Sequence, residues 1–167
     1  TVMVYIVMAC TVMAFMGMTY RAMAQIFMAY RDLACIVMAG IDGVTSSTSS
    51  ITGNYTFKAN AFFYEGHFEE NPITPGVLLT ETMAQIGVVC LGIYLLKDEI
   101  YLDKKPKIAL TSNQIDFFIP VLPNEKVTVV SEKEYFRFNK LKCTVKMLNE
   151  KDELVCRGTI SGMIIAK

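Results

Sequence analysis

Two side chains of this sequence, His67 and Glu81, are suited to act as a base and an acid on one substrate. His67 is the only histidine of the chain, and it follows an aromatic run and precedes a segment fixed by Pro72 and Pro75. A histidine beside aromatic residues is most often a packed core residue, but this proline-fixed setting favours a catalytic role. An imidazole accepts a proton near neutral pH, and a carboxyl group that burial keeps protonated can donate one. The pair predicts general acid–base chemistry.

Glu81 is the only charged residue of the apolar segment Val77–Leu96, which is hydrophobic on all sides. Such a segment predicts a helix enclosed by a sheet. A carboxyl group buried there must be paired or kept protonated with a raised pKa, and no Lys or Arg lies within a turn or two. Gln85, one helical turn further on, can hydrogen-bond Glu81 and fix its rotamer. This arrangement favours a functional carboxyl group over a structural one.

Gly76 is expected in the first turn of this helix, with Thr74 as N-cap and Pro75 as the first helical residue. Backbone N–H groups of a first turn have no acceptor within the helix, so the N–H of Gly76 can donate to a developing oxyanion. A base, an acid and an N–H donor on one fixed segment are the groups that remove a proton alpha to a carbonyl.

These residues closely resemble the signature of the hot-dog-fold 3-hydroxyacyl-acyl-carrier-protein dehydratases of the FabZ type. The family's spacing of fourteen residues between His and Glu is kept. Weaker resemblance runs from about Leu33 to Ile165 and includes Pro120-Val121-Leu122-Pro123. The run that carries the resemblance is Gly66-His67-Phe68-x-x-Asn71-Pro72-Ile73-x-Pro75-Gly76-Val77-Leu78-x-x-Glu81-x-Met83-Ala84-Gln85.

The resemblance implies a role for each matched residue. His67 would remove a proton from C2 of the substrate, and Glu81 would protonate the departing 3-hydroxyl group. The N–H of Gly76 would polarise the thioester carbonyl, and Gln85 would orient Glu81. Candidates for the walls of an acyl tunnel, with core packing as the equal alternative, are Phe63, Phe68, Val77 and Leu78.

The resemblance also implies the substrate and the assembly. The substrate would be a 3-hydroxyacyl thioester on acyl carrier protein, in fatty-acid or polyene-type biosynthesis, and the product a trans-2-enoyl thioester. No cofactor and no metal would be needed. In the family the His and Glu of one site come from different protomers, so the chain is expected to form a homodimer or a larger assembly such as a dimer-based hexamer.

The sequence departs from the family pattern at positions that carry no reacting group. Glu69 replaces a proline, Thr74 replaces an apolar residue, and Thr82 replaces an alanine. Phe118-Ile119 stands where family members often carry basic residues, and Asn124 replaces a turn glycine.

Two other functions are compatible with a hot-dog fold. An acyl thioesterase of this fold also uses a helix carboxylate but does not need His67 in this motif. A non-catalytic hot-dog subunit would pair with an active partner, although the presence of both His67 and Glu81 argues against it.

Charge and cysteine content exclude several other classes. The 16 basic and 16 acidic residues cancel, and no long block of one sign is present, so nucleic-acid binding is not expected. The five cysteines show no C-x-x-C spacing, and with a single histidine they predict no zinc site. Buried, reduced thiols in a cytoplasmic protein are the expected state.

Residues 33–167 are expected to form a single α+β domain, an antiparallel sheet wrapped around one long apolar helix. A turn is expected at Asp42-Gly43 and a loop at Ser46–Ser50. In Lys140–Met147 apolar and polar residues alternate, which predicts a strand with one buried face. Further strands are predicted at Ile51–Lys58, Lys107–Thr111, Gln114–Ile119, Lys126–Phe136 and Leu154–Ile165.

Residues 1–32 are an atypical Met/Ala-rich segment, and Thr1 to Tyr20 carry no charge. Methionine recurs there every five residues, which makes one stripe neither on a helix nor on a strand. A pentapeptide solenoid has this period, but only eight units are present, and Arg21, Arg31 and Asp32 interrupt the apolar positions. No basic region precedes the apolar stretch, which argues against a signal peptide. Three interpretations stay open: a buried helix followed by a strand near Leu33–Ile41, a membrane or interfacial segment, or a stretch that does not represent the natural chain. We expect no membrane association and base no function on this segment.

Overall fold

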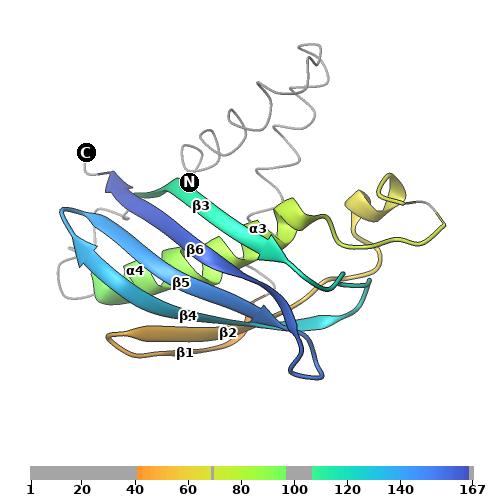
Figure 1. Ribbon diagram of the computed structural model, residues 1–167, viewed down its shortest axis with the longest axis horizontal. Coiled ribbons are helices and arrows are strands. Elements are labelled where there is room, and N and C mark those ends of the chain that lie inside the picture. The colour runs from red at the N-terminus through yellow and green to blue at the C-terminus, as the bar shows by residue number, and fades with distance from the viewer. Residues whose placement is uncertain (1–40, 69, 97–106, 166–167) are drawn as a thin grey trace, which may run out of the picture.

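One antiparallel sheet and one long helix make up the structure (Figure 1). The computed structural model describes residues 41–68, 70–96 and 107–165. The six strands are hydrogen-bonded in the order β1-β2-β4-β5-β6-β3, and every neighbouring pair is antiparallel. Their bounds are β1 Ile41–Ser46, β2 Ser50–Thr56, β3 Lys107–Phe117, β4 Lys126–Arg137, β5 Lys140–Leu148 and β6 Leu154–Ile165.

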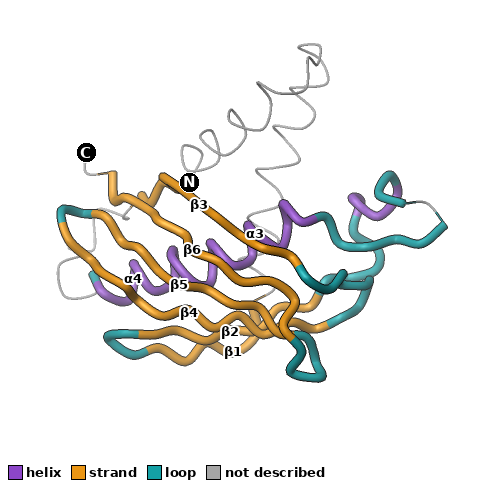
Figure 2. The backbone as a smooth tube through the Cα atoms, viewed as in Figure 1, coloured by secondary structure: helices purple, strands orange, loops and turns teal. Residues whose placement is uncertain are grey.

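The long helix lies along the inner face of the curled sheet (Figure 2). It runs from Gly76 to Leu95 as α3 (Gly76–Ala84), the π-helical turns η2 (Gln85–Cys90) and α4 (Leu91–Leu95). By length and composition this helix could cross a membrane, but 67% of its most apolar window is buried inside the protein, as in a core helix. The sequence-based prediction of an apolar helix wrapped by a sheet is confirmed.

The core lies between this helix and the inward side chains of the sheet. On β5 the side chains of Leu141, Cys143, Val145 and Met147 are buried, as the alternating pattern predicts. Burial raises the pKa of the Cys143 thiol to about 11 and that of Cys156 to about 12, and both thiols are free. These cysteines are packing residues, because a thiol with so high a pKa forms little nucleophilic thiolate.

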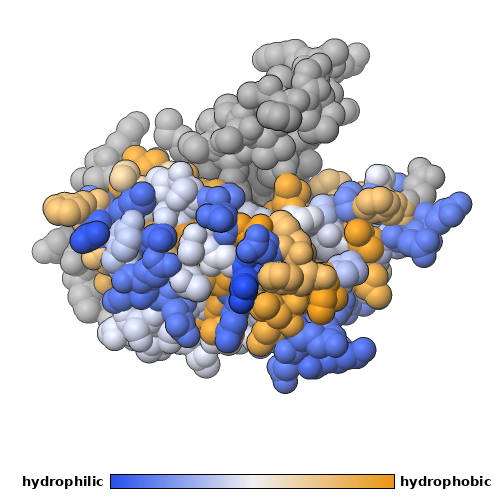
Figure 3. Space-filling model, viewed as in Figure 1, coloured by the Kyte–Doolittle hydropathy of each residue, from blue (hydrophilic) through white to orange (hydrophobic). Residues whose placement is uncertain are grey.

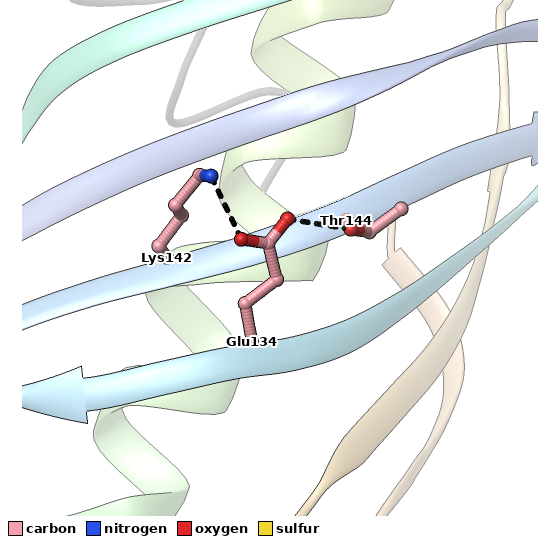
Figure 4. A network of polar contacts seen from close by, with 3 residues as sticks. All are labelled: Glu134, Lys142 and Thr144. Atoms are coloured by element: carbon pink, nitrogen blue, oxygen red, sulfur yellow. Dashed lines mark hydrogen bonds and ion pairs between the residues drawn. The ribbon is translucent and has the colours of Figure 1, made fainter.

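The exposed side chains of the central strands β4 and β5 are polar. Glu134 on β4 contacts two residues of the neighbouring β5, since its carboxylate lies 2.7 Å from Lys142 Nζ and accepts a 2.8 Å hydrogen bond from the Thr144 hydroxyl (Figure 4). The Lys142 and Thr144 partners lower the pKa of the Glu134 carboxyl. Exposed pairs of this kind contribute little to stability, so this cluster mainly marks the face that stays in water.

The structure corrects three local predictions. Asp42-Gly43 is a bulge within β1 and not a turn, because the register shifts there and Gly43 has a φ of 58°, which suits glycine. The two short strands expected between 107 and 119 are one strand, β3, interrupted by a bulge after Leu110. Thr74 is not the N-cap and Pro75 is not the first helical residue, since Pro75 is the N-cap and α3 begins at Gly76. The expected loop at Ser46–Ser50 is the short connection between β1 and β2.

The predictions made for residues 1–32 and for a strand at Leu33–Ile41 fall, except for Ile41, outside the described residues. The boundary at residue 33 therefore remains a prediction.

Candidate active site

The ring of His67 is held by the backbone of the loop that leads to α3. Its Nδ1 atom lies 2.9 Å from the carbonyl oxygen of Ile73. A carbonyl oxygen can only accept, so Nδ1 must carry the proton, and in the neutral ring Nε2 then keeps its lone pair. The ring also packs edge-on against Phe68, with ring centroids 4.6 Å apart. His67 is therefore arranged to accept a proton at Nε2.

The backbone next to His67 is in an uncommon conformation. Phe68 has a φ of 62°, and the N–H of Asn71 donates to the Phe68 carbonyl oxygen at 3.0 Å, which closes a tight turn. A left-handed conformation of a residue other than glycine costs about 1–3 kcal/mol and persists where the surroundings enforce it. The turn therefore depends on contacts elsewhere in the loop.

Glu81 lies in the second turn of α3 with only 7% of its surface exposed. Burial raises the pKa of its carboxyl group, and the hydrogen bond from Gln85 opposes this shift in part. Gln85 Nε2 donates to Glu81 Oε1 at 2.6 Å, as the i, i+4 spacing predicts. Because Oε1 accepts this bond, a proton on the carboxyl group belongs on Oε2, from which it can be donated.

Gly76 is the first residue of α3, so its N–H has no carbonyl oxygen to bond within the helix. The bonds of this turn begin with the N–H groups of Leu78 and Leu79, which both donate to the carbonyl oxygen of Pro75. A Cβ atom at Gly76 would lie 3.3 Å from the ring of Phe117, closer than normal contact. Glycine thus lets the aromatic ring approach the N–H donor.

Within one chain the candidate residues form two separate sets of contacts. His67 is bonded to Ile73, just before the first turn of α3 and Gly76, whereas Glu81 is bonded to Gln85 deeper in the helix. Within the described residues no hydrogen bond joins His67 to Glu81. Their meeting in one catalytic site, with His67 and Glu81 as acid–base pair, stays a prediction.

The four candidates for the acyl tunnel differ in exposure. Leu78 is buried in the core and Phe63 packs at its edge, whereas Phe68 is 61% exposed and Val77 46% exposed. Their role as tunnel walls stays a prediction, and for Phe68 and Val77 it requires a second surface to cover them.

Two departures from the family pattern have a clear structural role. The hydroxyl group of the buried Thr82 donates to the carbonyl oxygen of Leu78 at 2.8 Å, so it is satisfied inside the helix. Asn124 has a φ of 66°, and asparagine adopts this conformation more readily than most residues. Its side-chain oxygen also accepts the N–H of Ala59 at 3.0 Å, so the turn is kept without glycine.

Sequence reasoning missed three groups around His67. The Ile73 carbonyl oxygen carries no side-chain signal, and the hydroxyl groups of Tyr64 and Thr74 are joined only by the fold, at 2.6 Å. The one available signal was the polar Thr74 at a position where an apolar residue was expected.

Comparison with known proteins agrees with these features. The family model described as FabA-like domain matches residues 35–158. A 3-hydroxyacyl-acyl-carrier-protein dehydratase FabZ of Lactobacillus helveticus is 30% identical over 117 residues, which cover 69% of this chain and 74% of that protein. The FabZ of Chlamydia muridarum is 38% identical over 86 residues, or 52% of this chain, and the match spans only about half of the relative, 54% of its length.

Among solved structures, a thioesterase from Haemophilus influenzae superposes with a TM-score of 0.54, covering 75% of this chain and 78% of that one. At 14% sequence identity this likeness shows the fold alone. The family model covers the His67–Gln85 segment and the strands from β1 to the first part of β6. The chain therefore belongs to the FabA-like family, as a FabZ-type protein with the hot-dog fold.

Proposed function

We propose that this protein dehydrates 3-hydroxyacyl thioesters to trans-2-enoyl thioesters. The observation that carries the proposal is how the structure holds the two reacting groups. The Ile73 carbonyl oxygen accepts a hydrogen bond from Nδ1 of His67, which leaves Nε2 as a base, and burial raises the pKa of Glu81, which favours the protonated form that an acid needs. Removal of water needs one group of each kind.

The proposed reaction balances without any further reactant. His67 Nε2 takes a proton from C2, and the N–H of Gly76 donates to the thioester oxygen, where negative charge develops. The electron pair from the C2–H bond forms the C2=C3 double bond as the C3–O bond breaks. Glu81 gives its proton to the departing hydroxyl group, and water leaves. No cofactor takes part in these steps.

The substrate carrier and the pathway are part of the proposal. The relatives named as 3-hydroxyacyl-acyl-carrier-protein dehydratases support an acyl carrier protein as the carrier and fatty-acid biosynthesis as the setting. The free thiols of Cys90, Cys143 and Cys156 support a reducing, cytoplasmic compartment.

The proposed reaction is tested by incubating the purified protein with 3-hydroxyacyl carrier proteins of several chain lengths. We expect a mass loss of one water and an enoyl absorbance, with the thioester intact. Release of free carrier thiol without enoyl product would instead identify a thioesterase. No turnover by the pure protein, regained when a partner subunit is added, would identify a non-catalytic hot-dog subunit.

We propose in addition that the chain works as a homodimer, which can be the unit of a larger assembly. Hydrophobic surface gathers where β3 ends and where the segment before α3 lies (Figure 3). Among the described residues β3 pairs with β6 alone, so its outer edge is open to a second strand. Large exposed apolar patches mark interfaces, and the exposed residues at this end are Phe62, Phe68, Val77, Phe117, Phe118 and Leu122.

A second copy on this surface would cover Phe68 and Val77 and bring its own Glu81 toward His67. We therefore expect two inactive variants, H67A and E81Q, to restore activity when they are unfolded together and refolded as a mixture. A heterodimer of the two keeps one site with both native residues, so random pairing restores about one quarter of wild-type activity. The steady-state rate of the refolded mixture measures it.

Each variant refolded alone is the control for this mixing experiment. A mixture no more active than its components, with heterodimers shown by mass spectrometry, would place His67 and Glu81 of one site in the same chain.

A further inference from the structure

We infer that the buried hydroxyl pair of Tyr64 and Thr74 is a positioning device for His67, holding the loop in which the Ile73 carbonyl oxygen fixes the proton on Nδ1. The inference rests on the proposed function for its catalytic meaning, although the state of the ring can be measured without any substrate. Neither hydroxyl group would touch the substrate in this arrangement, so both are positioning residues.

The two hydroxyl oxygens lie 2.6 Å apart, and either can be the donor. Tyr64 is 8% and Thr74 4% exposed, so this hydrogen bond is inside the protein. Burying a hydroxyl group without a partner is costly. Because each hydroxyl group satisfies the other, the pair favours the one arrangement in which both residues are in contact.

Both partners are anchored in the domain, Tyr64 by its side chain and Thr74 by its backbone. Tyr64 belongs to the short 3-10 helix η1 (Phe62–Glu65), where its N–H donates to the carbonyl oxygen of Ala61 at 3.1 Å, and its side chain packs in the hydrophobic core. The N–H of Thr74 donates at 2.8 Å to the carbonyl oxygen of Val121, in the connection between β3 and β4. The hydrogen bond between the two hydroxyl groups therefore links Tyr64 to Thr74. These two residues are the ends of the loop that carries His67.

The contact that orients His67 lies inside this closed loop. Ile73 precedes Thr74 directly, so the position of its carbonyl oxygen follows the position of Thr74. The loop also holds Phe68 at a φ of 62°, a conformation that the surroundings must enforce. With the hydroxyl pair removed, the loop can relax this strain, and the carbonyl oxygen moves away from Nδ1.

The chemistry of position 74 supports a role beyond filling space. Val has the same shape as Thr and would fill the same volume without a polar atom to satisfy, and the family pattern has an apolar residue here. The buried Tyr64 hydroxyl group explains why this chain carries Thr instead. The two residues form one unit whose effect on the ring can be measured.

His67 is the only histidine of the chain, so its ring nitrogens can be observed without overlap in a protein that carries no histidine tag. In ¹⁵N-labelled wild type, long-range proton–nitrogen spectra are expected to show the neutral ring with its proton on Nδ1. T74V and Y64F are expected to show a mixture of both tautomers. T74S keeps a hydroxyl group and is expected to match wild type.

In the dehydration assay T74V and Y64F are expected to lower kcat on the order of tenfold with little change in KM, because misplacing a reacting group slows the chemical step. T74S should restore the rate. The matched control is T128V, which removes a hydroxyl group that bonds Asn54 at 2.9 Å in the sheet. It lowers stability without touching the loop, so its kcat and its His67 spectrum should stay at wild-type values.

The inference is overturned if folded Y64F or T74V keeps the wild-type tautomer and the wild-type pH profile of kcat. If T74V does not fold, the inference is tested by comparing Y64F, which lacks one hydroxyl group, with T74S, which keeps both. If the ring changes tautomer as expected while wild type makes no enoyl product, the proposed function fails and the positioning role stands.

Discussion

Replacing His67 by alanine is expected to lower kcat/KM for dehydration by about 10²–10⁴-fold, the usual contribution of a positioned general base. The reason is that His67 is the only histidine of the chain and its Nε2 carries the lone pair that can accept the proton. The fold should survive, because the ring is only half-buried and, among the described residues, its side chain bonds only to the backbone of the same loop. Steady-state kinetics with a 3-hydroxyacyl carrier protein measures the effect.

H67N is the matched control for the loop contact. The amide nitrogen of asparagine can take the place of Nδ1 and donate to Ile73, but the side chain has no atom in place of Nε2. We therefore expect H67N to be as inactive as H67A while its thermal stability stays nearer to wild type. Wild-type turnover in either variant would show that His67 is not the base and would refute the proposed reaction.

Replacing Glu81 by glutamine is expected to lower kcat by about 10²–10⁴-fold, because the amide cannot donate a proton to the leaving hydroxyl group. Glutamine is close in shape to a protonated carboxyl group, and its oxygen can still accept the hydrogen bond from Gln85. The active-site packing is thus kept while the acid is lost. The double variant of His67 and Glu81 should be scarcely slower than either single one, since residues that act as a unit are not additive.

The same substitution is expected to change how stability depends on pH. In the unfolded chain Glu81 loses its proton near the ordinary value of 4.5, whereas in the folded chain burial raises the pKa of the carboxyl group. Between these two values the folded state holds the extra proton, so wild-type stability falls as pH rises from about 4.5 through the raised folded pKa. Below 4.5 both states are protonated, and Glu81 imposes no penalty.

E81Q has no group to titrate at this position, so it should lack this decline and be more stable than wild type at neutral pH. Urea unfolding of both proteins across a pH series, at one fixed protein concentration, measures the difference between them. An E81Q protein that is less stable than wild type at neutral pH would show that the native carboxyl group is ionised and paired, which would remove the proposed acid.

The sequence by itself determined the architecture, and it named the candidate reacting residues. The apolar segment with the single charge of Glu81 predicted a helix enclosed by a sheet, and the i, i+4 spacing predicted the Gln85 contact. Both follow from local rules, since helix periodicity places residues four apart side by side and burial of an apolar surface needs a covering layer. The alternating residues of β5 predicted a half-buried strand for the same kind of reason.

Where strands begin and end depended on register, which local sequence specifies weakly. Asp42-Gly43 has the composition of a turn, but pairing with β2 carries β1 through it as a bulge. Two short strands were predicted between residues 107 and 119, yet pairing with β6 keeps β3 as one strand. In both places long-range hydrogen bonds outweighed the local preference.

The tertiary structure alone decided how the candidate base is held. Thr74 precedes a proline and has the residue type of an N-cap. In the structure its hydroxyl group is instead hydrogen-bonded to the hydroxyl group of Tyr64. The tautomer of His67 follows from a backbone carbonyl oxygen, a group that every residue has and that no sequence pattern distinguishes. The sequence identifies the residues whose side chains can react. Their protonation and orientation depend on neighbouring groups that come into contact only when the chain folds.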